Sequence, residues 1–264
     1  MKSIDELTND IITSLPSVLR TLSLKLIHTA LVYIFIRAAI TTSSANKKLK
    51  KLLFRLPYHL QATLLDPFFN GINFVRNLIE ELHEGYDFKF SRVDVLIELL
   101  RKHVGRVGSV LIVDCMSLIE FIALKAFLAN KKYYARFTDF FFINFSGLTR
   151  FMTKQLSYFG TLNDVARLIA ENVDASYHHV FRYLDKLVHE PCGMNLITFL
   201  EKLPLDEICC QIERMVSMYD SVLVTSDHGY NILWKNDFLY VDHGISSGIV
   251  KLNNLAFFMI IGRR

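Results

Sequence analysis

The sequence predicts an α/β protein with a mostly parallel sheet flanked by helices, preceded by an all-helical N-terminal region. From residue 109 onward, short apolar runs that end in polar residues alternate with stretches of helical periodicity. This alternation is typical of strands buried on both faces of a parallel sheet. Before that point, apolar residues recur at helical spacing, as in Val95, Leu96, Leu99 and Leu100. We therefore expect a helical region over residues 1–108 and a sheet domain over residues 109–264.

The sheet domain contains five short apolar runs that we interpret as strands. They cover residues 110–113, 140–144, 180–184, 222–225 and 255–261. The third run is the least regular, because Arg182 interrupts it. A hairpin is expected around residues 234–237. The alternation of strands and helices favours βαβ units, in which ligands bind at the carboxyl ends of the strands.

Composition narrows the class of protein. The chain has 264 residues, 52% of them hydrophobic, so it can bury an ordinary core. The net charge of +4 is mild and does not by itself indicate a nucleic-acid-binding protein. The four cysteines form no CxxC pair, and the first residues lack the apolar run of a signal peptide. These features predict a cytoplasmic protein with reduced cysteines.

Residues 22–39 form the most apolar stretch of the N-terminal half. Lys25, His28 and Arg37 interrupt it, and the uninterrupted part is shorter than the ~20 residues that a bilayer requires. We expect a buried helix here and no membrane span.

Polar side chains follow four of the expected strands, where a parallel sheet places its ligand site. They are Asp114, then Ser146 and Thr149, then Asp185, then Asp227 and His228. If a helical turn follows the third strand, Asp185 and His189 fall on one face and can share a cation; otherwise they are a helix cap and a surface histidine. Asp227 and His228 precede a glycine, and so does His243. Packing alone does not explain Asp185 and Asp227 together with the three histidines in these places.

Nitrogen and oxygen ligands together suit zinc in the first place and manganese as the alternative. Two such cations would clamp the attacking and leaving oxygens of a phosphoryl transfer. Ser146 and Thr149 both offer a hydroxyl near an expected helix start, a position that favours phosphate. Ser146 can also be a simple N-cap. Arg150 can bind a phosphate oxygen through its planar guanidinium or remain a solvated helix charge.

The order of these residues resembles the alkaline phosphatase superfamily. Within it, Ser226-Asp227-His228-Gly229 followed by His243-Gly244 and an apolar closing strand is similar to the PglZ domain. The resemblance covers residues 109–264. It implies that Asp185, His189 and His243 hold one metal, whereas Asp114, Asp227, His228 and the nucleophile oxygen hold the other. It also favours Thr149 over Ser146 as the nucleophile.

The resemblance implies a phosphatase or phosphodiesterase that works through a covalent phospho-enzyme. The family is associated with phage defence, so nucleotides or nucleic acid are among the expected substrates. The alternative is a non-catalytic PglZ-like scaffold or nucleic-acid-binding module with a structural metal site. In either case the N-terminal helices are a candidate surface for a protein partner.

The remaining polar residues have simpler interpretations. Ser117 is expected to cap a helix that starts at Leu118, and His178 and His179 are expected on the surface before the third strand. Glu190 is expected to be a solvated carboxylate. Two basic runs are expected as solvated helix faces, or as steering charges for a polyanion if they lie beside the metal site. They are Lys47, Lys48, Lys50, Lys51 and Arg55, and then Arg101, Lys102 and Arg106.

Overall fold

The structure is a computed structural model that describes residues 91–129, 131–156, 160–189, 194–195, 198–199, 202–235, 238–242 and 254–264. The helices in this part of the chain are α5 (Val93–His103), α6 (Leu118–Ala129), α7 (Thr149–Gln155), α8 (Leu162–Asn172), α9 (Tyr183–Val188) and α11 (Leu205–Tyr219). The strands are β1 (Ser109–Val113), β2 (Tyr133–Ile143), β3 (Tyr177–Phe181), β4 (Met194–Asn195), β5 (Ser221–Thr225), β6 (Asn231–Lys235), β7 (Phe238–Asp242) and β8 (Leu255–Arg263).

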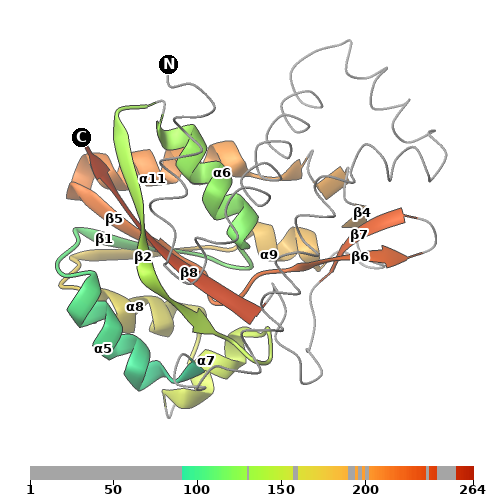
Figure 1. The fold of residues 1–264 in the computed structure, drawn as a ribbon, viewed down its shortest axis with the longest axis horizontal. Coiled ribbons are helices and arrows are strands. Elements are labelled where there is room, and N and C mark those ends of the chain that lie inside the picture. Colours follow the sequence, from blue (N-terminus) through green and yellow to red (C-terminus); the bar gives the residue numbers. More distant parts are fainter. Residues whose placement is uncertain are drawn as a thin grey trace.

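The main sheet has five strands in the order β2-β8-β5-β1-β3 (Figure 1). Strand β1 pairs in parallel with β3 and β5, whereas β8 pairs antiparallel with β5 and β2. It follows that β1, β2, β3 and β5 run in one direction and β8 runs against them. The α/β class is confirmed, and the sheet is mixed because the strand expected at 255–261 is antiparallel to both of its neighbours.

Helices cover both faces of this sheet (Figure 1). Along β1, Leu111 and Val113 belong to the core beneath α6 and α11, whereas Val110 and Ile112 belong to the core beneath α5 and α8. Strands β1 and β8 are buried on both faces for most of their length, which explains why they appear in the sequence as continuous apolar runs. Each fully buried large apolar side chain contributes roughly 1.5–3 kcal/mol to folding.

A second, three-stranded sheet has the order β4-β7-β6. Strands β6 and β7 form an antiparallel pair in which Lys235 lies opposite Phe238. The hairpin expected around residues 234–237 is therefore confirmed.

The two edge strands of the main sheet differ most from expectation. Strand β3 lies at 177–181, not at 180–184, and His178 and His179 lie inside it, opposite Val110 and Leu111. Its residues are exposed or half-buried, so the strand lacks the continuous apolar run of a central strand. Strand β2 starts at Tyr133, seven residues before the run expected at 140–144. The first half of the strand alternates between half-buried and exposed positions, so a search for apolar runs does not find it.

Several predictions fall on residues that the structure does not describe. These are the helices before residue 91, the basic run at residues 47–55, Glu190 and His243. The apolar stretch at 22–39 is also outside the described residues. Among the helices of the described residues, none is long and apolar enough to cross a membrane.

Candidate metal centre

The strand directions bring four chain segments to one edge of the main sheet. Asp114 follows β1, the turn that leads to Thr149 follows β2, and Asp227 follows β5. Asp185 lies in the first turn of α9, just past the end of β3. Strand β8 enters the sheet at this same edge, because Leu255 at its start pairs with Ile143 at the end of β2.

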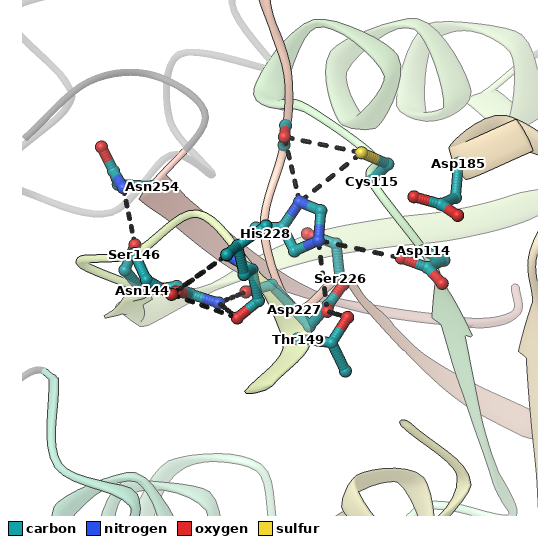
Figure 2. A network of polar contacts seen from close by, with 12 residues as sticks. Asp114, Cys115, Asn144, Ser146, Thr149, Asp185, Ser226, Asp227, His228 and Asn254 are labelled. Atoms are coloured by element: carbon teal, nitrogen blue, oxygen red, sulfur yellow. Dashed lines mark hydrogen bonds and ion pairs between the residues drawn. The ribbon is translucent and has the colours of Figure 1, made fainter. Parts of the chain in front are cut away.

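Three potential metal ligands meet at this edge. Asp114, Asp227 and His228 are all buried, and one ligand atom from each lies within 4.8 Å of the others. His228 Nε2 is 3.5 Å from Asp227 Oδ2 and 3.9 Å from Asp114 Oδ1. Figure 2 shows the imidazole edge and the two carboxylates converging on one point.

The donor set fits a cation. Asp114 Oδ1 and Asp227 Oδ1 are buried oxygens without a hydrogen-bond partner, and so is Ser226 Oγ. Buried carboxylate oxygens are costly unless they are hydrogen-bonded, paired or bound to a metal. His228 Nδ1 lies 3.1 Å from Gly229 O, which indicates that Nδ1 carries a proton and donates it to that carbonyl. The Nε2 lone pair then faces the carboxylates, as in a metal-ligating histidine.

The electrostatics of Asp114 agree with this interpretation. Its pKa is raised to about 8, chiefly by burial and then by the negative charges of Asp227 and Asp185, whereas the charge of Arg182 lowers it. Without a cation, a proton is therefore held at this carboxylate at neutral pH. A bound cation would replace the proton, because it favours the ionised form of its ligands.

Thr149 is the hydroxyl that contacts the cluster. It is the first residue of α7, and its Oγ1 donates a hydrogen bond of 2.6 Å to Asp227 Oδ2. Ser146 does not cap the helix; its hydroxyl donates to Asn144 Oδ1 and accepts a bond from the Leu148 N–H within the turn. Arg150 is exposed. Of the two candidate nucleophiles, only Thr149 has a described bond to a candidate ligand.

Asp185 and His189 form a separate, more open pair. His189 Nε2 lies 3.2 Å from Asp185 Oδ1, and their side chains are 57% and 29% exposed, respectively. The helical turn expected to place them on one face is present in α9. Figure 2 shows Asp185 on the Asp114 side of the cluster, and its charge acts on Asp114.

Cys115 is a neighbour of the centre that sequence reasoning missed. It follows Asp114 with a φ of 70°, in the left-handed region that non-glycine residues seldom adopt. Its Sγ lies 3.5 Å from His228 Nδ1 and 3.6 Å from Gly229 O. Burial is the main cause that raises the pKa of this thiol, which keeps it neutral. No sequence pattern reveals a positive φ at a cysteine.

Two further polar groups hold the loop after β5. Buried Glu120 on α6 accepts hydrogen bonds from the Ser117 N–H and hydroxyl and from the Tyr230 hydroxyl. Ser117 thus lies immediately before α6, at the position where the sequence predicts a cap, and its N–H and hydroxyl both donate to Glu120. On the other side, the Asn144 side-chain amide donates to Asp227 O at 2.9 Å. Asn144 follows a strand directly, which is the signal that could have identified it.

The smaller basic run does not lie at this edge. Arg101 and Lys102 are in the last turn of α5, and Arg106 precedes β1, whereas Asp114 follows β1. The run is thus near the amino end of β1, and the idea that it steers a polyanion into the centre is wrong for these three residues.

Compared with models of known protein families and with curated protein sequences, the chain matches none.

Proposed function

We propose that the protein is a metal-dependent phosphoric ester hydrolase with Thr149 as its nucleophile. The observation that carries this proposal is the 2.6 Å hydrogen bond between Thr149 Oγ1 and Asp227 Oδ2, inside a buried cluster in which Asp114 Oδ1 and Asp227 Oδ1 have no hydrogen-bond partner. A nucleophile hydroxyl bonded to a candidate metal ligand is the arrangement that phosphoryl transfer to a protein side chain needs.

Asp114, Asp227 and His228 would hold one cation, and Asp185 and His189 would contribute to a second with His243 from the sequence motif. Zinc is the first choice and manganese the second, because the ligands combine imidazole nitrogen with carboxylate oxygen. Bound cations of this kind lower the pKa of an attacking oxygen and neutralise charge on the transferred phosphoryl group.

The residues of the chain have defined tasks in this scheme. Asp227 Oδ2 holds the Thr149 hydroxyl, so that Oγ1 is positioned to attack phosphorus. The new bond joins Thr149 Oγ1 to phosphorus, the ester P–O bond breaks, and the alcohol leaves with a proton. Water then attacks the phosphorylated threonine, which releases inorganic phosphate when the substrate is a monoester, or a phosphate monoester when it is a diester, and restores the Thr149 hydroxyl. His228, fixed through Nδ1 on Gly229 O, keeps Nε2 in the cluster.

The PglZ-like order of residues supports the same proposal. In that order Asp114, the Thr149 hydroxyl, Asp185 and the Asp227–His228 pair come after β1, β2, β3 and β5, and the strand directions bring these segments to one sheet edge. A role in phage defence and a nucleotide or nucleic acid substrate rest on the family resemblance alone.

The proposal is tested by hydrolysis of para-nitrophenyl phosphate and of its bis ester by the purified chain with Zn²⁺ or Mn²⁺. We expect Thr149→Ala to remove turnover, Thr149→Ser to retain part of it and Ser146→Ala to retain most of it. Loss in Ser146→Ala with full activity in Thr149→Ala would move the nucleophile to Ser146. Metal bound at stoichiometric level without hydrolysis of either ester would favour the non-catalytic module instead.

A further inference from the structure

One buried amide connects the two loops that carry the proposed nucleophile and the proposed metal ligands. The Asn144 side chain is fully buried. Its Nδ2 donates 2.9 Å hydrogen bonds both to Leu148 O and to Asp227 O. Its Oδ1 accepts bonds from the Ser146 hydroxyl and the Leu148 N–H. Figure 2 shows Asn144 between the turn that holds Ser146 and the loop that holds Asp227.

The two hydrogen bonds from Asn144 Nδ2 join the same two chain segments as the bond between Thr149 Oγ1 and Asp227 Oδ2. Leu148 immediately precedes Thr149, so fixing its carbonyl fixes the backbone from which the hydroxyl projects. Asp227 is held twice: by its carbonyl on Asn144 and by its carboxylate on Thr149. The Asn144 bonds act on main-chain atoms, and they remain available whatever binds to the carboxylate.

The chemistry of the side chain suits this task. A primary amide carries two N–H donors on one nitrogen, so one atom can bridge two carbonyl oxygens. Aspartate has nearly the same shape but would turn an acceptor oxygen toward both carbonyls. Alanine has no polar group, and serine has a single donor on a shorter side chain.

We infer that Asn144 is a positioning residue that sets the distance and orientation of the Thr149 hydroxyl relative to the Asp227–His228 loop. The inference rests on the proposed function, because it assigns Asn144 a part in the reaction of Thr149. Asn144 touches neither substrate nor metal in this scheme; it acts through the two backbones.

Asn254 provides a matched control. It is also a fully buried asparagine, and its Nδ2 donates to Asn144 O and Phe145 O. It therefore ties the same turn to the start of β8, and both of these bonds end on carbonyl oxygens of that turn. Asn144→Ala and Asn254→Ala each remove a buried side-chain amide that donates two hydrogen bonds to backbone carbonyl oxygens.

The first test compares the steady-state kinetics of the two variants on para-nitrophenyl phosphate in the metal-loaded protein. We expect Asn144→Ala to lower kcat by about 10²-fold with KM nearly unchanged, since misplacing a reacting group has this order of effect. Asn144→Ser should lie between Asn144→Ala and wild type. Equal losses of kcat in Asn144→Ala and Asn254→Ala would overturn the inference, because both would then be general effects of loosening the turn.

The second test uses hydrogen exchange of the metal-free full chain and needs no activity. In Asn144→Ala, amides of both segments, 144–149 and 226–229, should exchange faster than in wild type. In Asn254→Ala only 144–149 should do so. Faster exchange confined to 144–149 in both variants would show that Asn144 does not connect the loops. If wild type hydrolyses neither ester while the exchange pattern appears as expected, the bridge stands and the proposed function fails.

Discussion

The two halves of the candidate centre differ in the burial of their side chains and in how these side chains are paired. On the β1–β5 side, Asp114, Asp227 and His228 are buried, and their polar atoms face one another with carboxylate oxygens left unpartnered. On the α9 side, Asp185 and His189 are partly exposed and are paired with each other. The first half gathers buried groups that could hold a cation, whereas the two side chains of the second contact each other and lie partly in solvent.

The surroundings explain the difference. The buried half lies at the ends of adjacent strands β1 and β5, and its loop is held by Glu120, Cys115 and Asn144 from three separate segments. The other half lies on a helix of six residues that follows an edge strand. Central strands thus support the half that contains Asp114, Asp227 and His228, whereas the half that contains Asp185 and His189 depends on a short helix.

The largest loss of turnover should come from a change at Asp227, which is both a candidate metal ligand and the acceptor of the Thr149 hydroxyl. In Asp227→Asn, an amide replaces the carboxylate that accepts the Thr149 hydroxyl, so both metal binding and nucleophile placement suffer. We expect turnover of para-nitrophenyl phosphate to fall by roughly 10³-fold or more. Turnover close to that of wild type would show that the buried half is not the reaction centre.

Metal titration of the chelator-treated protein tests the comparison directly. We expect two unequal affinities for Mn²⁺, measured by calorimetry, with the tighter one lost in Asp114→Asn and the weaker one lost in Asp185→Asn. The separation should be about 10–100-fold, the range attributed to support from outer contacts. If Asp185→Asn removes the tighter site, the order of the halves is reversed.

The same contrast separates what the sequence could predict from what it could not. Asp114 and the Asp227–His228 pair follow central strands whose continuous apolar runs are easy to recognise, so their shared edge is predictable. Asp185 was placed correctly at that edge although strand β3 lies three residues earlier than expected, because the helix of Tyr183–Val188 extends toward the same side. Edge strands are partly exposed to solvent and contain polar residues, so their first and last residues are hard to recognise in the sequence.

Other features depend on contacts that no local pattern encodes. The reversed direction of β8 is not visible, since a strand buried on both faces has the same composition in either orientation. The positive φ of Cys115 and the two hydrogen bonds that the Asn144 side-chain amide donates arise from segments that meet only in the folded chain. The residue types at the centre were therefore predictable, and the residues that hold them were not.

A pH experiment sharpens the comparison through Asp114, whose pKa burial raises to about 8. The unfolded chain ionises this carboxyl near pH 3.8, so between these values the metal-free folded state binds more protons than the unfolded state. Stability from this group is then greatest at low pH and is lost as pH rises toward 8.

We expect the free energy of unfolding of metal-free protein to fall by about 2 kcal/mol more in wild type than in Asp114→Asn between pH 6 and pH 8. Urea denaturation with a chelator present measures the difference. Asp185→Asn, in the open half, should retain most of the pH dependence. Identical pH dependence in wild type and Asp114→Asn would mean that the buried half does not hold a proton.

The smallest expected effect concerns the anchor of the buried half on α6. In Tyr230→Phe, Glu120 loses one donor and keeps both donors of Ser117, so the free energy of unfolding should fall by only about 1 kcal/mol. Tyr183→Phe is the control, because Tyr183 is 49% exposed on α9 in the open half and its change should have no measurable effect. Equal stability of the two variants in urea denaturation would show that the Glu120 contact does not stabilise the loop. A loss in Tyr230→Phe alone would show that the contact between Tyr230 and Glu120 of α6 stabilises the loop of the buried half.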